Sequence, residues 1–238
     1  MTTLLIDGDI IAYQAAAATE IPIQWDEDLW TLHCTPSEAY ARVEDTVASL
    51  MEKAGCDTAL VCLTSKSNFR KEIDPEYKAN RNKVRKPTCL KQVREFMVKN
   101  MKTKTVDGLE ADDLLGIFMT KNPDKYIMWS IDKDLKQIAG RHLTEDGIIL
   151  ISEEEAEFNF WMQVLTGDQA DNYKGIQGVG PVKAERILKE DNGLSYWGKV
   201  KAAYEKAGLT VEDAIITARL AHILRHETKD ILWEPPSE

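Results

Sequence analysis

The sequence has no long apolar run. No stretch approaches the roughly 18–20 consecutive apolar residues that cross a membrane as a helix. The N-terminal apolar stretch ends in small residues, as a signal peptide does, but it lacks a basic start, and Asp7 and Asp9 interrupt it. We therefore expect neither a membrane span nor secretion.

Cysteine is scarce, and its spacing is not that of a metal ribbon. The four cysteines, Cys34, Cys56, Cys62 and Cys89, form no CxxC pair. Isolated cysteines of this kind suit a reducing compartment, so we expect a cytoplasmic protein without a disulfide framework or zinc ribbon.

What remains is the composition of an ordinary globular protein. The chain has 238 residues, of which 43% are apolar and 8% aromatic, and it contains no evident repeat or low-complexity tract. This length suffices for one large domain or two small ones with an ample core.

The net charge of −10 hides an asymmetry. The basic segment, residues 66–104, holds thirteen Lys or Arg and four Asp or Glu, a local balance of 13 − 4 = +9. The rest of the chain therefore carries −10 − 9 = −19. Such a split favours a surface that meets a polyanion, although a solvated helical surface segment is the alternative.

Short apolar strands alternate with amphipathic helices in the first two-thirds of the chain. This order predicts an α/β fold with a mainly parallel sheet over residues 1–165, followed by a small helical part over residues 166–238. Residues 21–34 read as a separate β-hairpin. The predicted strands of the sheet are residues 3–8, 58–63, 103–106 and 126–131.

Acidic residues follow the predicted strands. Two of them, Asp132 and Asp134, are expected on one strand face, and Asp168 and Asp171 on one helix face. Strand ends and the starts of the following helices meet at the carboxyl edge of a parallel sheet, so these acids should converge there. The full set is Asp7, Glu110, Asp112, Asp113, Asp132, Asp134, Asp168 and Asp171.

Eight carboxylates in one place would repel one another unless cations neutralise them. Hard oxygen ligands suit Mg²⁺, with Mn²⁺ as a substitute, and the absence of paired Cys or His ligands argues against zinc. Each acid also has a structural explanation, since acids cap helices and favour their first turns.

A glycine-rich turn is the second signal. In "GIQGVGPVKAERIL", residues 175–188, Gly178 and Gly180 open a predicted helix, with Lys183 in its first turn. Free N–H groups at a helix start can hold a phosphate without reading its base. The pattern is typical of a DNA-binding helix–hairpin–helix, and a plain helical hairpin is the alternative.

These motifs, in this order, resemble those of the 5′-nuclease superfamily. That family includes flap endonucleases, the 5′-nuclease domain of bacterial DNA polymerase I and phage 5′→3′ exonucleases, and the chain is most similar to those of the T-odd podophages. The resemblance rests on "LLIDGD", "NFRKEIDPEYKANR", "GLEADDLLG", "SIDKDLKQI" and "TGDQADNYKGIQGVG".

The resemblance implies Mg²⁺-dependent cleavage of DNA near a free 5′ end or flap by two metal ions held by the eight acids. It implies that Lys78 and Arg81 contact the scissile phosphate at the base of a helical arch within residues 74–103. A potassium ion at the glycine turn is a further implication. The other residues expected to bind DNA are Arg70, Lys83, Arg85, Lys86, Gly178, Gly180 and Lys183.

The sequence departs from the family in one place. The family carries another aspartate after the strand "ALVCL", whereas here Ser65 stands near that position and no acid lies between Asp57 and Glu72. A weakened metal site, and with it a non-catalytic DNA-structure binder, is therefore one alternative function.

A phosphatase is another alternative. "LLIDGDII" resembles the opening motif of haloacid-dehalogenase-like phosphatases, in which Asp7 would be the nucleophile, but Ile11 stands where that motif has Thr or Val. The sequence leaves open the preference for exonuclease or flap cleavage, the use of an RNA/DNA hybrid, and the oligomeric state. If the chain is phage-encoded, its location is the cytoplasm of the infected bacterium.

Overall fold

The computed structural model describes residues 2–227 and 232–236. Its centre is a six-stranded sheet in the order β5-β4-β1-β6-β7-β8, in which only β8 is antiparallel to its neighbour. This confirms the predicted α/β class. The strands are β1 (Thr3–Asp7), β4 (Thr58–Cys62), β5 (Thr103–Lys104), β6 (Tyr126–Trp129), β7 (Gly140–Thr144) and β8 (Gly147–Ile151).

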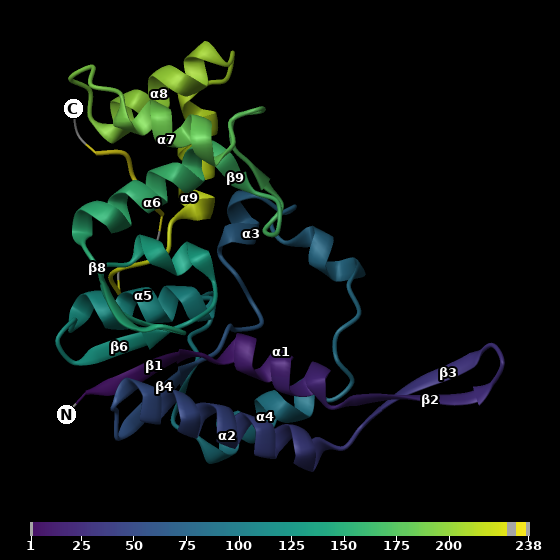
Figure 1. The fold of residues 1–238 in the computed structure, drawn as a ribbon. Coiled ribbons are helices and arrows are strands. Elements are labelled where there is room, and N and C mark those ends of the chain that lie inside the picture. Colours follow the sequence, from purple (N-terminus) through teal and green to yellow (C-terminus); the bar gives the residue numbers. More distant parts are fainter. Residues whose placement is uncertain (1, 228–231, 237–238) are drawn as a thin grey trace.

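Alternation along β1 divides the apolar side chains between the two faces of the sheet. Leu4 and Ile6 face one core, which α1, α2 and α4 cover, and Leu5 faces a second core, which α5 covers (Figure 1). The helices are α1 (Gly8–Ala18), α2 (Pro36–Ala54), α4 (Leu90–Asn100) and α5 (Ala111–Lys121).

Gly8 allows the start of α1 to pack closely against the sheet. A Cβ atom on Gly8 would lie 2.5 Å from Cγ1 of Val61 and 2.8 Å from the carbonyl oxygen of Cys62. Because only hydrogen fits there, α1 begins directly at the end of β1, and Asp7 is held at the carboxyl edge of the sheet.

The second part of the molecule is a helical cluster. Its core joins residues of four helices with Tyr77, and it includes Phe160 and Val164 of the first helix, which precede the predicted boundary at residue 165. The helices are α6 (Glu153–Thr166), α7 (Pro181–Lys189), α8 (Tyr196–Lys206) and α9 (Val211–Ala221). None of the helices within the described residues is long and apolar enough to cross a membrane.

Several parts of the fold differ from the sequence-based expectations. The antiparallel pair β7–β8 was not predicted. The last two acids lie on the short ribbon of β9 (Gly167–Asp168) and β10 (Tyr173–Lys174) and on its connecting turn, not on a helix. Gly167 has a φ of +65°, and a Cβ atom on it would lie 2.1 Å from the backbone nitrogen of Gly175, so the ribbon depends on this close approach.

The basic segment is not one arch. Its last part, α4, is packed into the sheet core through Val93 and Met97. Residues 74–89, here called the outer loop, connect α3 (Arg70–Ile73) with α4 and include η1 (Ala79–Lys83), a short 3₁₀-helix (Figure 1). Near its two ends, Tyr77 is buried in the helical core and Cys89 in the sheet core.

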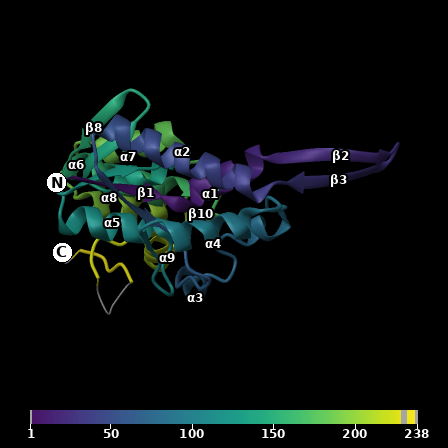
Figure 2. The ribbon, with the colours of Figure 1, turned by 90° about the horizontal axis from the view of Figure 1, so that it is seen from below.

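The predicted hairpin is present as β2 (Glu20–Asp26) and β3 (Leu29–Cys34). It projects far beyond the rest of the molecule, as Figure 2 shows from below. At its base Cys34 forms a disulfide with Cys89, a single bridge that the expectation of no disulfide framework did not foresee, while Cys56 and Cys62 are free. Cys34 and Cys89 are 55 residues apart, so their spacing in the sequence does not predict the pair. The fold brings them together because the base of the hairpin lies beside the start of α4.

Candidate active site

Three carboxylates share the carboxyl edge of the central strands. Asp7 ends β1 and accepts hydrogen bonds from the backbone N–H of Asp9 and the hydroxyl of Ser130. Burial raises the pKa of Asp7 to about 6, and the charge of Asp132 adds to this. Burial, followed by the charges of Asp7 and Asp132, raises the pKa of Asp112 well above its usual value. These acids are close enough to repel one another.

A second acidic group adjoins the first through Asp132. Burial and the charges of Asp132 and Asp168 raise the pKa of Asp134 to about 7. Asp168 is 8% exposed, and its nearest cation is the ammonium group of Lys133 at 3.7 Å. The acids from β1, α5, η2 (Lys133–Gln137) and β9 thus form one electronegative edge.

The local geometry of two acidic pairs differs from the prediction. Asp132 caps η2, and its carboxylate accepts the backbone N–H of Asp134 at 2.9 Å, so the pair lies in a 3₁₀ turn and not on a strand face. Asp168 accepts the backbone N–H of Ala170 at 2.6 Å in the turn before β10. Both motifs are carboxylate-capped turns, which short Asp-x-x spacing cannot distinguish from a helix start.

Glu110 is tied to cations. Its Oε1 accepts from the ammonium group of Lys78 at 2.5 Å, and its Oε2 from the guanidinium of Arg70 at 3.0 Å. Burial alone would raise the pKa of Glu110, but the charges of Lys78 and Arg70 outweigh it and lower the pKa to about 2. Glu110 is therefore ionised and already paired.

Lys78 occupies a rare backbone conformation. Its φ of +56° lies in the left-handed region, which costs a non-glycine residue roughly 1–3 kcal/mol. The backbone N–H of Lys78 donates to the carbonyl oxygen of Asp171 at 2.8 Å and holds this conformation. The ammonium group consequently points into the acidic edge, 3.4 Å from the Asp171 carboxylate.

Arg81 and Tyr77 complete this side of the site. The Arg81 guanidinium donates to the Asp171 carboxylate, and 54% of its side chain remains exposed. The hydroxyl of Tyr77 lies 3.0 Å from both Glu110 and Asp171. The sequence reasoning did not single out Tyr77, although it adjoins Lys78 in the "EYKANR" motif.

Two predicted site residues have a different role. Arg70 is 2% exposed, and it donates to both oxygens of Asp113 and to the backbone carbonyls of Leu220 and His222. It cannot reach DNA from there, so its assignment to DNA binding is wrong.

Asp113 is fully buried, and each of its oxygens accepts two hydrogen bonds. Oδ1 accepts from Arg70 and from the backbone N–H of Leu224, and Oδ2 from Arg70 and the backbone N–H of Glu110. Two oxygens with four filled acceptor positions have no lone pair to offer a cation.

Ser65 does not face the acids. Its hydroxyl donates to the carbonyl of Ser67 at 2.6 Å and accepts from the N–H of Gly108 at 3.1 Å, within a surface loop. The acid beside the end of β4 is Asp9 of α1, whose carboxylate accepts the N–H of Thr64 at 3.0 Å and pairs with Arg94. The hydroxyl of Ser65 is therefore used within this loop, and the loss of a ligand at position 65 stays a prediction.

Apart from Arg70, the predicted DNA-binding residues lie on two exposed surfaces. On the outer loop, Lys83 and Lys86 are exposed, and Arg85 is 58% exposed although it pairs with Glu20. The other surface is the glycine turn before α7. Both surfaces adjoin the acidic edge, because the outer loop contains Lys78, which pairs with Glu110 and Asp171, and the glycine turn follows β10.

The glycine turn is open to a ligand. Gly178 has a φ of +75°, and neither it nor Gly180, which caps α7, has an atom within 4 Å of a Cβ position. Lys183 donates to the Gly178 carbonyl at 2.8 Å. A β-ribbon separates α6 from this turn, so the two helices do not flank it directly, and the helix–hairpin–helix stays a prediction.

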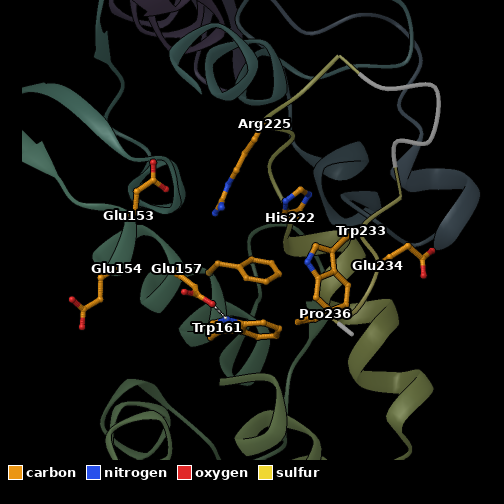
Figure 3. A pocket seen from close by; sticks show the side chains of 10 residues that line it. Glu153, Glu154, Glu157, Trp161, His222, Arg225, Trp233, Glu234 and Pro236 are labelled. Atoms are coloured by element: carbon orange, nitrogen blue, oxygen red, sulfur yellow. Dashed lines mark hydrogen bonds between the residues drawn. The ribbon is translucent and has the colours of Figure 1, made fainter. Parts of the chain in front are cut away.

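A pocket of about 480 Å³ lies elsewhere, between α6 and the C-terminal segment (Figure 3). Its wall is formed by Phe160, Trp161 and Trp233, and the buried Nδ1 of His222 and Nε of Arg225 have no hydrogen-bond partner among the described residues. None of the predicted metal ligands lines it. Its glutamates are Glu153, Glu154, Glu157 and Glu234.

The donor set at the acidic edge fits hard divalent cations. Burial and mutual repulsion raise the pKa values of Asp7, Asp112 and Asp134, and a divalent ion removes that repulsion. Within residues 2–227 and 232–236, no three Asp, Glu, His or Cys side chains are already arranged to hold an ion. The acids are gathered, but they still need small side-chain movements to converge on one point.

Comparisons with known proteins agree with this arrangement. Residues 2–168 match the model of the 5′-3′ exonuclease N-terminal resolvase-like domain. The exodeoxyribonuclease of Enterobacteria phage T3 and the exonuclease of Escherichia phage T7 are each 29% identical to the chain, over 98% of the chain and 93% of the relative.

The fold is also similar to solved structures. The flap endonuclease of bacteriophage T5, in a pseudo-enzyme–product complex with DNA and metal ions, superposes with a TM-score of 0.65 at 17% identity, over 93% of this chain and 89% of that one. From its family match over most of its length, this chain belongs to the 5′-3′ exonuclease family.

Proposed function

We propose that the protein is a Mg²⁺-dependent 5′→3′ exonuclease and flap endonuclease that hydrolyses phosphodiester bonds near DNA 5′ ends. One observation carries the proposal: buried, mutually repelling carboxylates lie at the same edge as Lys78 and Arg81. Cations attract a phosphate to that edge, and the carboxylates can hold the ions that the reaction needs.

Asp7, Asp112, Asp132, Asp134 and Asp168 are the side chains that would hold the metal. When bound, two Mg²⁺ ions supply an activated water and stabilise the leaving 3′-oxygen. Glu110 and Asp171 hold Lys78 and Arg81 in place, and Asp113 acts only through Arg70. Mn²⁺ has the same preference for oxygen ligands.

Lys78 and Arg81 would bind the equatorial oxygens of the scissile phosphate and stabilise the charge that develops there. The glycine turn and the cations of the outer loop would hold the DNA backbone on either side of the cut. Because the 3′-oxygen is the leaving group, the phosphate stays on the 5′ end of the product strand.

The remaining expectations belong to the same proposal. The Gly178 carbonyl, which accepts from Lys183, would be among the groups near a potassium ion at the turn. An RNA/DNA hybrid would be a further substrate, because cations that bind phosphates meet the same group in RNA and in DNA. The place of action would be the cytoplasm of the bacterial host.

Digestion of a 5′-labelled flap and a 5′-recessed duplex, each with and without Mg²⁺, tests the proposal. Release of label only with Mg²⁺ supports it, and the ratio of the two rates gives the preference between flap and exonuclease cleavage. Binding without cleavage under every condition would contradict it in favour of a DNA-structure binder. Hydrolysis of a small phosphate ester instead of DNA would favour the phosphatase alternative.

A further inference from the structure

The two ends of the outer loop are fixed to different parts of the molecule. Its near end is bonded to the turn between β9 and β10: Asn80 donates to the carbonyl of Gln169 at 3.0 Å, and Asn172 donates to the carbonyl of Glu76 at 2.7 Å. This end also carries Lys78, so the turn that holds it belongs to the acidic edge.

The far end is bonded to the base of the projecting hairpin through a single carboxylate. The Arg85 guanidinium donates to both oxygens of Glu20, at 2.7 and 2.6 Å. The backbone N–H and the hydroxyl of Thr88 donate to the same carboxylate, at 2.7 and 2.6 Å. Only 8% of the Glu20 side chain is exposed, although the hairpin that bears it extends into solvent.

Hydrogen bonds from Arg85 and then Thr88 lower the pKa of Glu20 to about 2. The carboxylate is therefore ionised at any pH at which the enzyme would work. A bidentate guanidinium pair of this kind fixes direction as well as distance.

A second bond lies beside the first. Cys34 faces Glu20 across the β2–β3 pair, and it forms the disulfide to Cys89, with 6.2 Å between the two Cα atoms. The two opposite residues of the hairpin base therefore bind Arg85, Thr88 and Cys89, which lie within five consecutive positions.

Between these anchors the loop has little support of its own. Residues 82–86 are all exposed, and the cations Lys83 and Lys86 are among them. The position of these cations relative to the acidic edge is thus set by the bonds at the two ends.

We propose that Glu20 is a positioning residue for DNA binding, which together with Cys34 fixes the far end of the outer loop. This inference rests on the proposed function. A loop that is already fixed loses less conformational entropy when DNA binds, and the affinity for DNA is higher for that reason. Lys78 and Arg81 are held separately, so Glu20 affects binding of the strand and not the reaction at the phosphate.

Limited trypsin digestion tests the anchor without any nuclease activity. Trypsin cuts after Lys83 and Arg85, whereas Pro87 protects the bond after Lys86. We expect Glu20→Gln to be cut after Lys83 and Arg85 faster than the parent, most of all with dithiothreitol. Glu27→Gln removes the same charge at the exposed tip of the same hairpin and serves as the control. Equal cutting of all three proteins under reducing conditions would overturn the anchor.

Single-turnover cleavage over a range of enzyme concentrations tests its consequence. We expect Glu20→Gln to raise the enzyme concentration at half-saturation about threefold to tenfold, since DNA binding weakens, and to leave the rate at saturation unchanged. Arg85→Glu loses both the ion pair and a cation of the outer loop, and Glu20→Arg combined with Arg85→Glu should bind DNA more tightly than Arg85→Glu alone because the ion pair is restored. An equal loss of rate at saturation in Glu20→Gln, or a double variant no better than Arg85→Glu alone, contradicts the positioning role.

The two proposals can fail separately. If no variant cleaves DNA, the proposed function fails while the trypsin result still decides whether Glu20 anchors the loop. If the parent cleaves DNA and Glu20→Gln matches it in both assays, the positioning role is wrong and the nuclease remains.

Discussion

Asp112 and Asp113 are neighbours in α5, yet their surroundings are opposite. Asp113 has both oxygens filled by Arg70 and two backbone N–H groups, and no solvent reaches it. Asp112 is partly exposed at the acidic edge, where burial and the charges of Asp7 and Asp132 disfavour its ionised form. One carboxylate is satisfied by the protein, and the other is not.

The difference between the two carboxylates distinguishes a structural role from a role in the reaction. A carboxylate whose lone pairs are all used stabilises the fold and holds its partner, here the guanidinium that also holds Glu110. A carboxylate that the fold leaves in repulsion is available to a cation and a substrate. The same contrast gives four predictions, of which the first three replace single side chains at or beside the acidic edge.

The largest effect should come from Asp112→Asn. Loss of one anionic ligand should weaken the charge stabilisation at the edge and slow single-turnover cleavage about 10³-fold or more. Binding of DNA should persist, and the midpoint of urea unfolding should not fall, since the substitution removes repulsion. A rate within tenfold of the parent would show that this carboxylate does not serve the reaction.

Asp113→Asn is the matched substitution one residue further. It leaves the Arg70 guanidinium buried with Glu110 as its remaining carboxylate partner, and breaking a buried pair in this way costs about 3–5 kcal/mol. We expect a lower midpoint of urea unfolding, with cleavage by the remaining folded protein reduced far less than by Asp112→Asn. If instead stability is unchanged and activity is lost, Asp113 belongs with the ligands after all.

Lys78→Ala should have the next largest effect. Removing a cation aimed at the reacting phosphate should lower the single-turnover rate at saturation about 10²-fold, with a smaller change in affinity. Glycine at position 78 is the informative comparison, because it accepts the left-handed backbone without strain but also lacks the ammonium group. Equal rates for the two variants would assign the loss to the charge, and a much faster glycine variant would assign it to the backbone.

The sequence was sufficient to predict the parallel strands that precede several of the acids. The strands that end at Asp7 and before Asp132 were predicted from their apolar runs, and the rule that parallel strands share a carboxyl edge brought them together. The β7–β8 pair was not predicted because the side chains of Gly140–Thr144 and Gly147–Ile151 are largely half-buried or exposed, and these segments therefore lack the buried apolar run that marks β1.

The spacing of residues in the sequence could not predict which side chains already have all their hydrogen-bond partners within the protein. "GLEADD" gives three acids in one helical turn, but only the packing of Arg70, whose own neighbours come from the distant residues Leu220 and His222, decides that Asp113 is filled. The same holds for Ser65, whose hydroxyl is used by a loop that includes Gly108. The disulfide of Cys34 likewise depends on where the fold returns the chain.

The smallest effect should come from Lys183→Ala, at the glycine turn. Its ammonium group donates to the Gly178 carbonyl at 2.8 Å and is otherwise exposed beside the N-terminal end of α7. A lysine that meets a phosphate contributes a salt-dependent part of affinity, so its loss should weaken DNA binding severalfold and lower the salt slope by about one unit. The single-turnover rate at saturation should stay near that of the parent, because Lys183 would bind a phosphate other than the one that reacts. The matched control is Lys189→Ala, at the other end of the same helix, where the ammonium group pairs with Glu185 at 2.6 Å and should leave the slope unchanged. A parent-like slope for Lys183→Ala, or a loss of rate like that of Lys78→Ala, would mean that DNA binding at the glycine turn and the reaction at the acidic edge are not separate roles.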